Sequence, residues 1–484
     1  MLVVMTQTLP PEPAPAVSNA AATPTGYGAR RTVALLAVIL TGQFMAVLDS
    51  SIVNVAIPSI RGDLRTSGSS LQLIVAGYVI AYAVLLVTGA RLGDRFSQRR
   101  VFIAGLAVFT AASLACGLAW DETALIVFRF AQGIGAAAMV PQVMTLIQRD
   151  FTGNARAKAL SLYSAIISGG VVIGQVLGGL IVYADLFETG WRGVFLVNVP
   201  IGLALLVAAP KVLPADSARY HRAVDLPGLG MLTVAVLLLV LPLVLGHEQD
   251  WPLWTWISLG ASVIAVGAFL LIERVVAARG GEPLFAHRAL RAPRLLLTAA
   301  TLFVVMATFG GWMFVIAIHL QSTLGYSAMH AGLLFIPMGL TFALGSLYWE
   351  RLPARSHARM IPAGLVVAAV SMVAMGMLLR EGAEFGVAAL ILSGFMGLGN
   401  GLAFSPLMTR TLARIPRDLA ADASGILVTN VQLGIVVGIA CFGTVFLGPA
   451  GATTVSAAHA LGGTAIAEGV TVLVAAVLAA RAAR

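Results

Sequence analysis

Two ionisable residues that lie inside long apolar runs, Asp49 and Arg129, are the strongest candidates for chemistry in this chain. An ionised side chain at the middle of a bilayer costs about 3 kcal/mol on insertion scales, so each residue requires a partner or an aqueous cavity. A carboxyl group placed there could bind a proton and release it in exchange for another ligand. A permanent ion pair that holds two helices together is the alternative interpretation.

The positions of the two residues predict that they pair. Asp49 lies nine residues before Pro58, near the expected outer end of the first run, and Arg129 lies six residues after Thr123, at the outer start of the fourth. At about 1.5 Å per residue, both side chains lie roughly 9–14 Å below the outer surface. The arginine could take part in proton exchange or serve as a fixed counter-charge.

The elements that must position these residues are membrane-spanning helices. The chain has 484 residues, 59% of them hydrophobic and 11% charged, with a mean hydropathy of +0.94, which is too apolar for a soluble multidomain protein. A spanning helix needs about 20 mainly apolar residues. Fourteen such runs occur, at 33–56, 71–90, 101–120, 123–147, 158–183, 193–213, 225–245, 253–276, 295–320, 329–349, 360–379, 385–409, 423–447 and 461–481. We expect an all-α membrane protein with fourteen transmembrane helices.

The net charge of +9 is placed so that it orients the protein. With a cytoplasmic N-terminus, 25 of the 30 Lys and Arg residues fall in the tails and the inner turns. This is the positive-inside bias of membrane proteins, and it removes a nucleic-acid-binding interpretation of the excess charge. We expect a multi-pass protein of the plasma (inner) membrane with both termini cytoplasmic.

The runs divide into groups of six, two and six. The expected domains are a disordered cytoplasmic tail (1–31), a six-helix bundle (32–213), two additional helices with basic linkers (214–294) and a second six-helix bundle (295–484). The additional helices are expected to be scaffold without intramembrane charge. The turn Arg91–Arg99 is echoed by Arg351–Arg359, with three arginines and one leucine in register. Repeated halves with a substrate site at their interface are a recurrent transporter design, so we expect a pseudo-twofold relation.

Motifs of enzymes and of metal sites are absent from the sequence. Cys116 and Cys441 fall in separate expected spans without metal-ligand spacing, and we interpret both as packing residues. The chain has no HExxH, GxxxxGK[ST] or GxSxG pattern. We therefore expect no enzymatic activity, no cofactor, no metal and no use of ATP.

A loop motif and several helix motifs resemble the major facilitator superfamily. Gly89-x-x-x-Gly93-Asp94-Arg95, with the arginines that follow it, is similar to the signature loop between helices 2 and 3 of that family. Leu48–Pro58 and Arg129–Gly135 resemble the first-helix and fourth-helix motifs of its fourteen-span drug:proton antiporter branch. The match continues at Trp191–Gly202, Leu320–Gly332 and Ala423–Gly425. The resemblance covers nearly the whole chain from about residue 33 onward.

This resemblance implies a proton-coupled exporter of hydrophobic or cationic small molecules, drugs or antibiotics, that works by alternating access. It implies that Arg129 takes part in proton coupling and that Asp94 docks near Asp422–Ser424, which would hold the cytoplasmic side closed. The residues of this conformational lock would be Gly89, Gly93, Asp94, Arg95, Arg99 and Arg100. A solvated charged turn is the alternative.

Small residues are spaced along one face of the fifth run, where another backbone could approach closely. They are Gly170, Gly174, Gly178 and Gly179. They resemble the exporter motif GxxxGPxxGG, except that Gln175 stands at the proline position. Glutamine restores the backbone donor that proline would remove and adds a polar amide. A plain packing face is the alternative function for these residues.

Other polar and aromatic residues within the runs could line a cavity. The uncharged polar ones, expected to hydrogen-bond between helices, are Asn54, Gln132, Asn198, Asn430 and Gln432. An adaptable apolar lining could come from Phe44, Met45, Phe309, Trp312, Met313, Phe335 and Phe404. Glu468 is expected near a helix end and receives no role.

Two alternatives to broad drug export remain open at this point. One is a dedicated exporter of a single natural product or metabolite, and the other is a non-transporting membrane sensor or scaffold. The expected partners are a small-molecule substrate, protons and the lipid bilayer, without nucleic acid, and the protein is expected to be monomeric.

Overall fold

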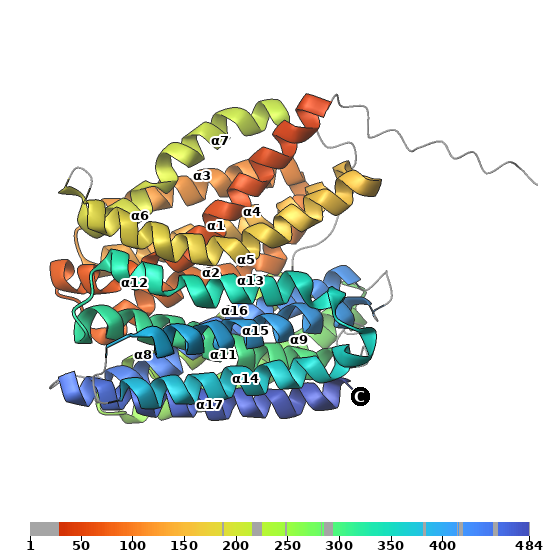
Figure 1. Ribbon diagram of the computed structural model, residues 1–484. Coiled ribbons are helices and arrows are strands. Elements are labelled where there is room, and N and C mark those ends of the chain that lie inside the picture. Colours follow the sequence, from red (N-terminus) through yellow and green to blue (C-terminus); the bar gives the residue numbers. More distant parts are fainter. Residues whose placement is uncertain are drawn as a thin grey trace, which may run out of the picture.

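The computed structural model describes residues 29–185, 188–214, 225–246, 249–281, 283–284, 294–380, 384–413, 415, 420–448 and 454–483. Within these segments the chain is helical and contains no strand, as expected for an all-α membrane protein (Figure 1). The expected disordered tail lies outside the described residues up to residue 28.

The helices form three consecutive groups along the chain. The first comprises α1 (Ala29–Leu64), α2 (Gly68–Phe96), α3 (Gln98–Gly117), α4 (Glu122–Asp150), α5 (Gly153–Ala184), η2 (Gly190–Arg192), α6 (Gly193–Leu196) and α7 (Asn198–Val212). The second comprises α8 (Leu226–Leu245) and α9 (Leu253–Ala278). The third comprises α11 (Leu295–Ile318), η4 (His319–Thr323), α12 (Ala328–Leu334), α13 (Ile336–Tyr348), η5 (Trp349–Arg351), η6 (Ala354–Ser356), α14 (His357–Leu379), α15 (Val387–Ala413), α16 (Ala420–Leu447) and α17 (Thr454–Ala483).

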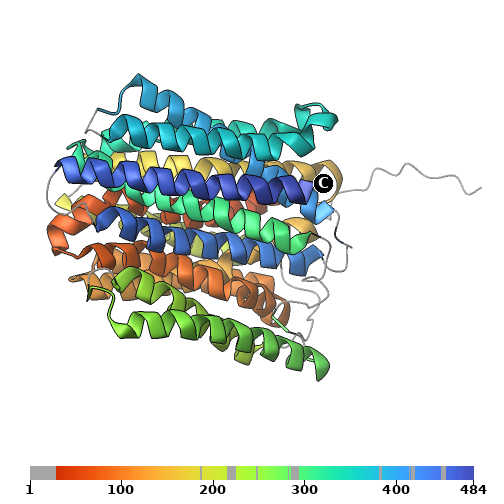
Figure 2. The same ribbon diagram turned by 90° about the horizontal axis from the view of Figure 1, so that it is seen from below.

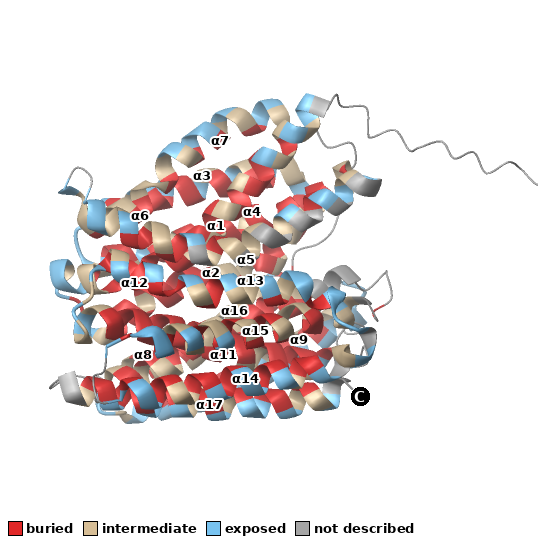
Figure 3. Cartoon of the chain, viewed as in Figure 1, coloured by how far each residue is buried: buried red, intermediate tan, exposed pale blue. Residues whose placement is uncertain are grey.

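Thirteen helices of the described segments are long and apolar enough to cross a membrane. The fifth predicted run lies within α5, which is not one of these thirteen. Its apolar part, Gly169–Ala184, is shorter than the other candidate spans. Large apolar side chains face outward along the helices, such as Val263 and Ile264 of α9, which are 72% and 73% exposed (Figure 3). Outward-facing residues of this kind suit a hydrocarbon solvent, because lipid offers them no penalty.

The helices of the first group and those of the third group pack against one another in an equivalent pattern. In the first group α1 packs against α5, α4 packs against both α2 and α3, and α3 packs against α7. In the third group α11 packs against α16, α15 packs against both α13 and α14, and α14 packs against α17. The main contacts between the two groups are those of α5 with α12 and α13 and of α2 with α16, and α1 makes smaller contacts with α11 and α12.

The two additional helices stand at one edge of the molecule, where Figure 2 shows them in green. α8 packs against α9 and touches both α2 and α16, so it covers one of the two seams between the groups. The Thr444 hydroxyl of α16 donates to the Leu243 carbonyl of α8 at 2.8 Å. The expectation that this pair carries no charge within its helices is wrong, because Glu273, which already lay inside the expected run 253–276, is a buried residue of α9.

The last helix corrects the expected position of Glu468. α17 begins at Thr454, seven residues before the expected start of the last run, and its 30 residues place Glu468 at the middle of the helix with 0% exposure. The polar residues Thr454, Ser456 and His459 lower the local hydropathy, which hides the first two turns from a count of apolar residues.

Candidate functional site

Asp49 and Arg129 form an ion pair in the interior of the first helix group. The Nη1 atom of Arg129 lies 2.5 Å from Oδ2 of Asp49, and both side chains are 0% exposed. Asp49 lies on α1 and Arg129 on α4, so the pair joins two helices that are far apart in sequence. The pairing predicted from depth is therefore confirmed.

Two amide side chains complete the coordination of the carboxylate. Gln132 donates from Nε2 to Oδ1 of Asp49 at 2.7 Å, and Asn198 donates from Nδ2 to the same oxygen at 3.0 Å. Gln132 lies three residues after Arg129, which places both on one face of α4. Asn198 is the first residue of α7, at the joint with α6. Both were among the expected cavity-lining residues, and both lie at the ion pair.

The arginine has a further set of partners that the sequence did not reveal. Its Nε donates to the Ile74 carbonyl of α2 at 3.0 Å. Its guanidinium carbon lies 4.6 Å from the centre of the Tyr78 ring and 5.5 Å from that of Phe195, within the range of cation–π attraction. Its Nη2 atom has no hydrogen-bond acceptor among the described residues. A tyrosine inside the second predicted run was the one available signal for this arrangement.

Gln132 extends the network to α3. Its Nε2 also donates to the Ser113 hydroxyl at 2.7 Å, and its Oε1 accepts from Arg129 Nη1 at 2.7 Å. Cys116 lies 3.8 Å from the same amide oxygen, so this cysteine borders the site in addition to packing. The site is thus a buried polar network in which one anion faces one cation and several neutral groups.

The remaining polar candidates lie elsewhere. Asn430 of α16 donates to the Ala299 carbonyl of α11 at 2.6 Å, within the third helix group. Asn54 is buried on α1, and its Oδ1 has no partner among the described residues. Gln432 is half-buried on α16. None of these three residues belongs to the Asp49 network.

The glycines of α5 allow close packing against two different helices, α1 and α12. A methyl group on Gly178 would lie 2.8 Å from the Ile52 carbonyl, and Gly170 and Gly174 face Val47 and Ser51 of the same helix, α1. Gly179 instead faces the third helix group, where a methyl group would lie 2.5 Å from the Ala328 carbonyl. The glycine face therefore packs α5 on α1 and also brings α5 directly against α12.

Gln175, at the position of the motif proline, lies in the same seam. It is 1% exposed, its Nε2 lies 3.8 Å from the Met313 sulfur of α11, and its Oε1 has no partner among the described residues. On the opposite wall, a methyl group on Gly332 would lie 2.7 Å from the Gln175 carbonyl. The backbones of α5 and α12 are thus in close contact around this residue.

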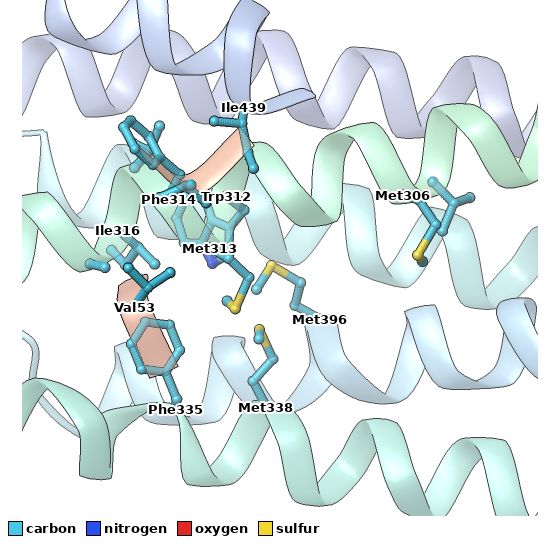
Figure 4. Close-up of a cluster of buried hydrophobic side chains, with 14 of the residues drawn as sticks. Val53, Met306, Trp312, Met313, Phe314, Ile316, Phe335, Met338, Met396 and Ile439 are labelled. Carbon is cyan, nitrogen blue, oxygen red and sulfur yellow. The ribbon is translucent and has the colours of Figure 1, made fainter. Parts of the chain in front are cut away.

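A methionine-rich apolar cluster lies beside this seam. In Figure 4 the sulfur ends of Met313, Met338 and Met396 point toward one another, and Val53 of α1 lies near Ile316 and Phe335 in the same cluster. Methionine side chains are flexible and polarizable and adapt to irregular shapes. Three expected lining residues, Trp312, Met313 and Phe335, belong to this cluster and are buried.

The charged turn expected from the sequence comprises the last residues of α2 and the first residues of α3, and it packs tightly on its own helix group. Gly89 and Gly93 allow α2 to approach α4, where Gln142 donates to the Gly89 carbonyl at 2.8 Å. Arg99 donates to the Pro210 carbonyl at the end of α7. Asp94 accepts from Gln98 at 3.4 Å.

The other residues of the turn differ in their surroundings. Arg95 lies over the Phe96 ring and is exposed, as is Arg100. Arg91 donates to the carbonyls of Pro283 and Leu284, in the segment after α9. The expected dock for Asp94 falls on Asp422 and Ser424, whose side chains lie outside the described residues, so the conformational lock stays a prediction.

Sequence comparison relates the chain to antibiotic and drug exporters. The "Probable actinorhodin transporter" of Streptomyces coelicolor is 36% identical over 441 residues, which cover 90% of this chain and 76% of that protein. The cephamycin export protein of Amycolatopsis lactamdurans is 34% identical, covering 88% of this chain and 87% of that protein. A multidrug resistance protein of Mycobacterium tuberculosis is 32% identical, covering 85% of this chain and 75% of that protein.

Structural comparison agrees on the fold. A bacterial homologue of the human lysosomal transporter Spinster, in an inward-facing and unoccupied conformation, superposes with a TM-score of 0.70 at 15% identity. The match covers 95% of this chain and 98% of that one. The family model of the Major Facilitator Superfamily matches residues 39–439, which include the Asp49 network and both seams. With relatives and fold in agreement, this multi-pass membrane protein belongs to the Major Facilitator Superfamily of transporters.

Proposed function

We propose that the chain is a proton-coupled exporter of hydrophobic or cationic small molecules, drugs or antibiotics, that works by alternating access. The observation that carries the proposal is the fully buried Asp49–Arg129 pair, held by Gln132 and Asn198. The names of the relatives, which include antibiotic export proteins and a multidrug resistance protein, support export as the direction of transport.

Protonation of Asp49 is the proposed coupling step. A proton that binds a carboxylate oxygen removes the negative charge and leaves the Arg129 cation buried without a counter-charge. A lone buried charge costs several kcal/mol, so α1 and α4 are expected to rearrange until water or substrate solvates the arginine. Release of the proton restores the pair. If the pair is purely structural instead, Asp49 never exchanges its proton during transport.

The proposed architecture has fourteen spans in two six-helix bundles, 32–213 and 295–484, related by a pseudo-twofold axis, with 214–294 inserted between them. The recurrence of packing partners in the first and third helix groups supports this arrangement, with α5 as the fourteenth span. The distribution of Lys and Arg supports cytoplasmic termini. We place the substrate path at the seam between the bundles and propose a monomer.

The chemistry of the seam favours hydrophobic substrates. The methionine-rich cluster around Met313 and Met338 offers an adaptable apolar surface, and re-packing surfaces of this kind suit broad specificity. A dedicated exporter of one natural product is the second candidate, favoured by relatives named for single antibiotics such as actinorhodin and cephamycin. The membership of the family makes a non-transporting sensor the weakest candidate.

The available driving force is sufficient for export. Moving one charge through 100 mV supplies about 2.3 kcal/mol. Each pH unit adds about 1.4 kcal/mol. With both terms available, a single proton exchanged at Asp49 could therefore sustain a substrate gradient of about two to three orders of magnitude.

Transport by purified protein in proteoliposomes tests the proposal. An imposed pH gradient should drive uptake of ethidium, a hydrophobic cation, with proton movement in the opposite direction. Asp49→Asn should abolish this exchange, whereas the control Asp63→Asn, on the exposed end of the same helix, should retain it. Undiminished exchange by Asp49→Asn would contradict the assignment. Activity toward actinorhodin alone, within a panel of unrelated compounds, would favour the dedicated exporter.

A further inference from the structure

Glu468 is an acidic residue buried within the third helix group, in addition to Asp49 of the first group and Glu273 of α9. It lies at the middle of α17 with 0% exposure. Neither Oε1 nor Oε2 has a hydrogen-bond partner among the described residues. Asp49, by contrast, accepts hydrogen bonds from three side chains. The carboxyl groups of Asp49 and Glu468 are therefore in opposite electrostatic situations.

The position of Glu468 depends on a glycine of the neighbouring helix. A methyl group on Gly311 of α11 would lie 2.7 Å from Oε1 of Glu468 and 2.6 Å from the Phe442 ring of α16. The missing side chain leaves the space that the carboxyl occupies, at the junction of α11, α16 and α17. The next residue on α11, Trp312, belongs to the apolar cluster beside the seam.

No cationic side chain forms an ion pair with Glu468 in the part of the chain that the structure describes. α11 carries no titratable residue, η4 carries the buried His319, and α16 carries Cys441 among its described side chains. On α14 the residues are His357 and Arg359 at one end, with Arg380, just beyond the other end, near Gly462. α17 itself adds His459 and Arg481. None of these groups has an ion pair or hydrogen bond with Glu468.

The charge state follows from this environment. An isolated carboxylate transferred from water into an apolar interior is far more costly than its neutral acid, so such a group keeps its proton. The oxygen lone pairs of the neutral carboxyl still have no hydrogen-bond donor among the described residues. A water molecule or a cation that entered the site would therefore bind these oxygens. The Glu468 carboxyl could thus release its proton when neighbouring helices move apart and water reaches it.

The two helix groups place their acidic residues in related positions. α7 packs against α1, and Asn198 of α7 faces the Asp49 carboxylate of α1. α17 packs against α11 in the same way, but here the carboxyl stands on α17 and the facing residue of α11 is Gly311. Each half therefore holds one buried carboxyl at the contact between its first and last helices.

We propose that Glu468 is a second proton-binding site, located in the second half of the protein and occupied in the conformation described here. The inference rests on the proposed function, because a bound proton matters for transport only if protons are exchanged. The O–H bond of the carboxyl breaks when movement of α11 away from α17 admits water, and the proton passes to that water. Export of one substrate would then involve protons from Asp49 and from Glu468.

The number of protons exchanged per substrate tests this site. In proteoliposomes, Glu468→Gln should still move ethidium but with one proton fewer per ethidium than wild type. The matched control Glu350→Gln, at an exposed position in η5, should keep the wild-type ratio. A wild-type ratio in Glu468→Gln would overturn the site and leave the proposed function standing. Absence of any proton movement in wild type would instead refute the proposed function.

Infrared spectroscopy tests the bound proton without transport. The reconstituted wild type at neutral pH should show the carbonyl stretching band of a protonated carboxyl, and Glu468→Gln should lack it. If Glu468→Gln does not fold, Glu468→Asp keeps the acid and should shift the band. Spectra in which neither substitution changes the protonated-carboxyl band would overturn the proposal.

Discussion

Arg129 meets Asp49 through one terminal nitrogen, at 2.5 Å, while its other terminal nitrogen has no acceptor among the described residues. The pair is fully buried, and the guanidinium also lies over the ring of Tyr78. Among the described residues this cation has one anionic partner and an unused donor, so the loss of the carboxylate changes its energy greatly. This asymmetry leads to the first prediction.

Asp49→Asn and Arg129→Gln should each destabilise the protein by about 3–5 kcal/mol, because each leaves an uncompensated buried charge. The double variant should be more stable than either single variant, since both charges are removed together. Thermal unfolding of the purified proteins in detergent measures this difference.

Measuring proton-coupled transport by the same three variants distinguishes a proton-exchanging Asp49 from a purely structural ion pair. All three variants should lack it if Asp49 exchanges the proton. A double variant that regains stability and also transports at the wild-type rate would show that the pair is purely structural.

Gly179→Ala should loosen the contact between α5 and α12. The added methyl would lie 2.5 Å from the Ala328 carbonyl and 2.9 Å from the Met329 Cα, which are backbone atoms that cannot rotate away. Overpacking of this kind costs about 1–3 kcal/mol, which here favours conformations with the seam open. A cysteine placed at the buried Ala331, with Cys116 and Cys441 replaced, should react faster with a membrane-impermeant maleimide.

Gly169→Ala is the matched control for this experiment. A methyl group at Gly169 meets no atom within 4 Å, so the same substitution on the same helix should leave labelling unchanged. Equal labelling rates in both variants would show that the Gly179 contact does not hold the seam closed.

Gln175→Leu should be neutral or slightly stabilising. The amide donates only to a sulfur at 3.8 Å, and its oxygen lacks a partner among the described residues, so an apolar side chain removes a poorly satisfied polar group. Gln175→Pro, which restores the family motif, should cost about 3 kcal/mol or more because it removes a backbone donor within α5. Thermal unfolding of both variants checks these signs, and a strongly destabilised Gln175→Leu would show that the amide has an essential partner.

Arg91→Ala should free the segment that follows α9. Arg91 donates to the carbonyls of Pro283 and Leu284, and hydrogen bonds from charged donors contribute about 1.5–3 kcal/mol. Hydrogen exchange at the Leu284 amide, which donates to Glu273 at 2.9 Å, should accelerate. Arg95→Ala, at an exposed position of the same turn, should leave this exchange rate unchanged. Similar acceleration in both variants would argue against a specific anchor.

Much of the fold could be predicted from local sequence. The helical nature and the length of the apolar runs follow from the bilayer, since every span must satisfy its own backbone and match the same thickness. The buried position of Glu468 could not be predicted in this way, because polar residues at the start of α17 obscure where the helix begins. A boundary error of a few residues moved a carboxyl from the middle of a helix to its end.

Local sequence was enough to show that one aspartate and one arginine share a depth within the membrane, because depth depends only on position along a helix. The neighbours of these residues follow from tertiary packing instead. The third donor to Asp49 comes from the first residue of α7, and the space for Glu468 comes from a glycine of α11, far away in the sequence. Which faces of separate helices meet depends on packing across the whole molecule, so the difference between a paired and an unpaired carboxyl exists only in the folded protein.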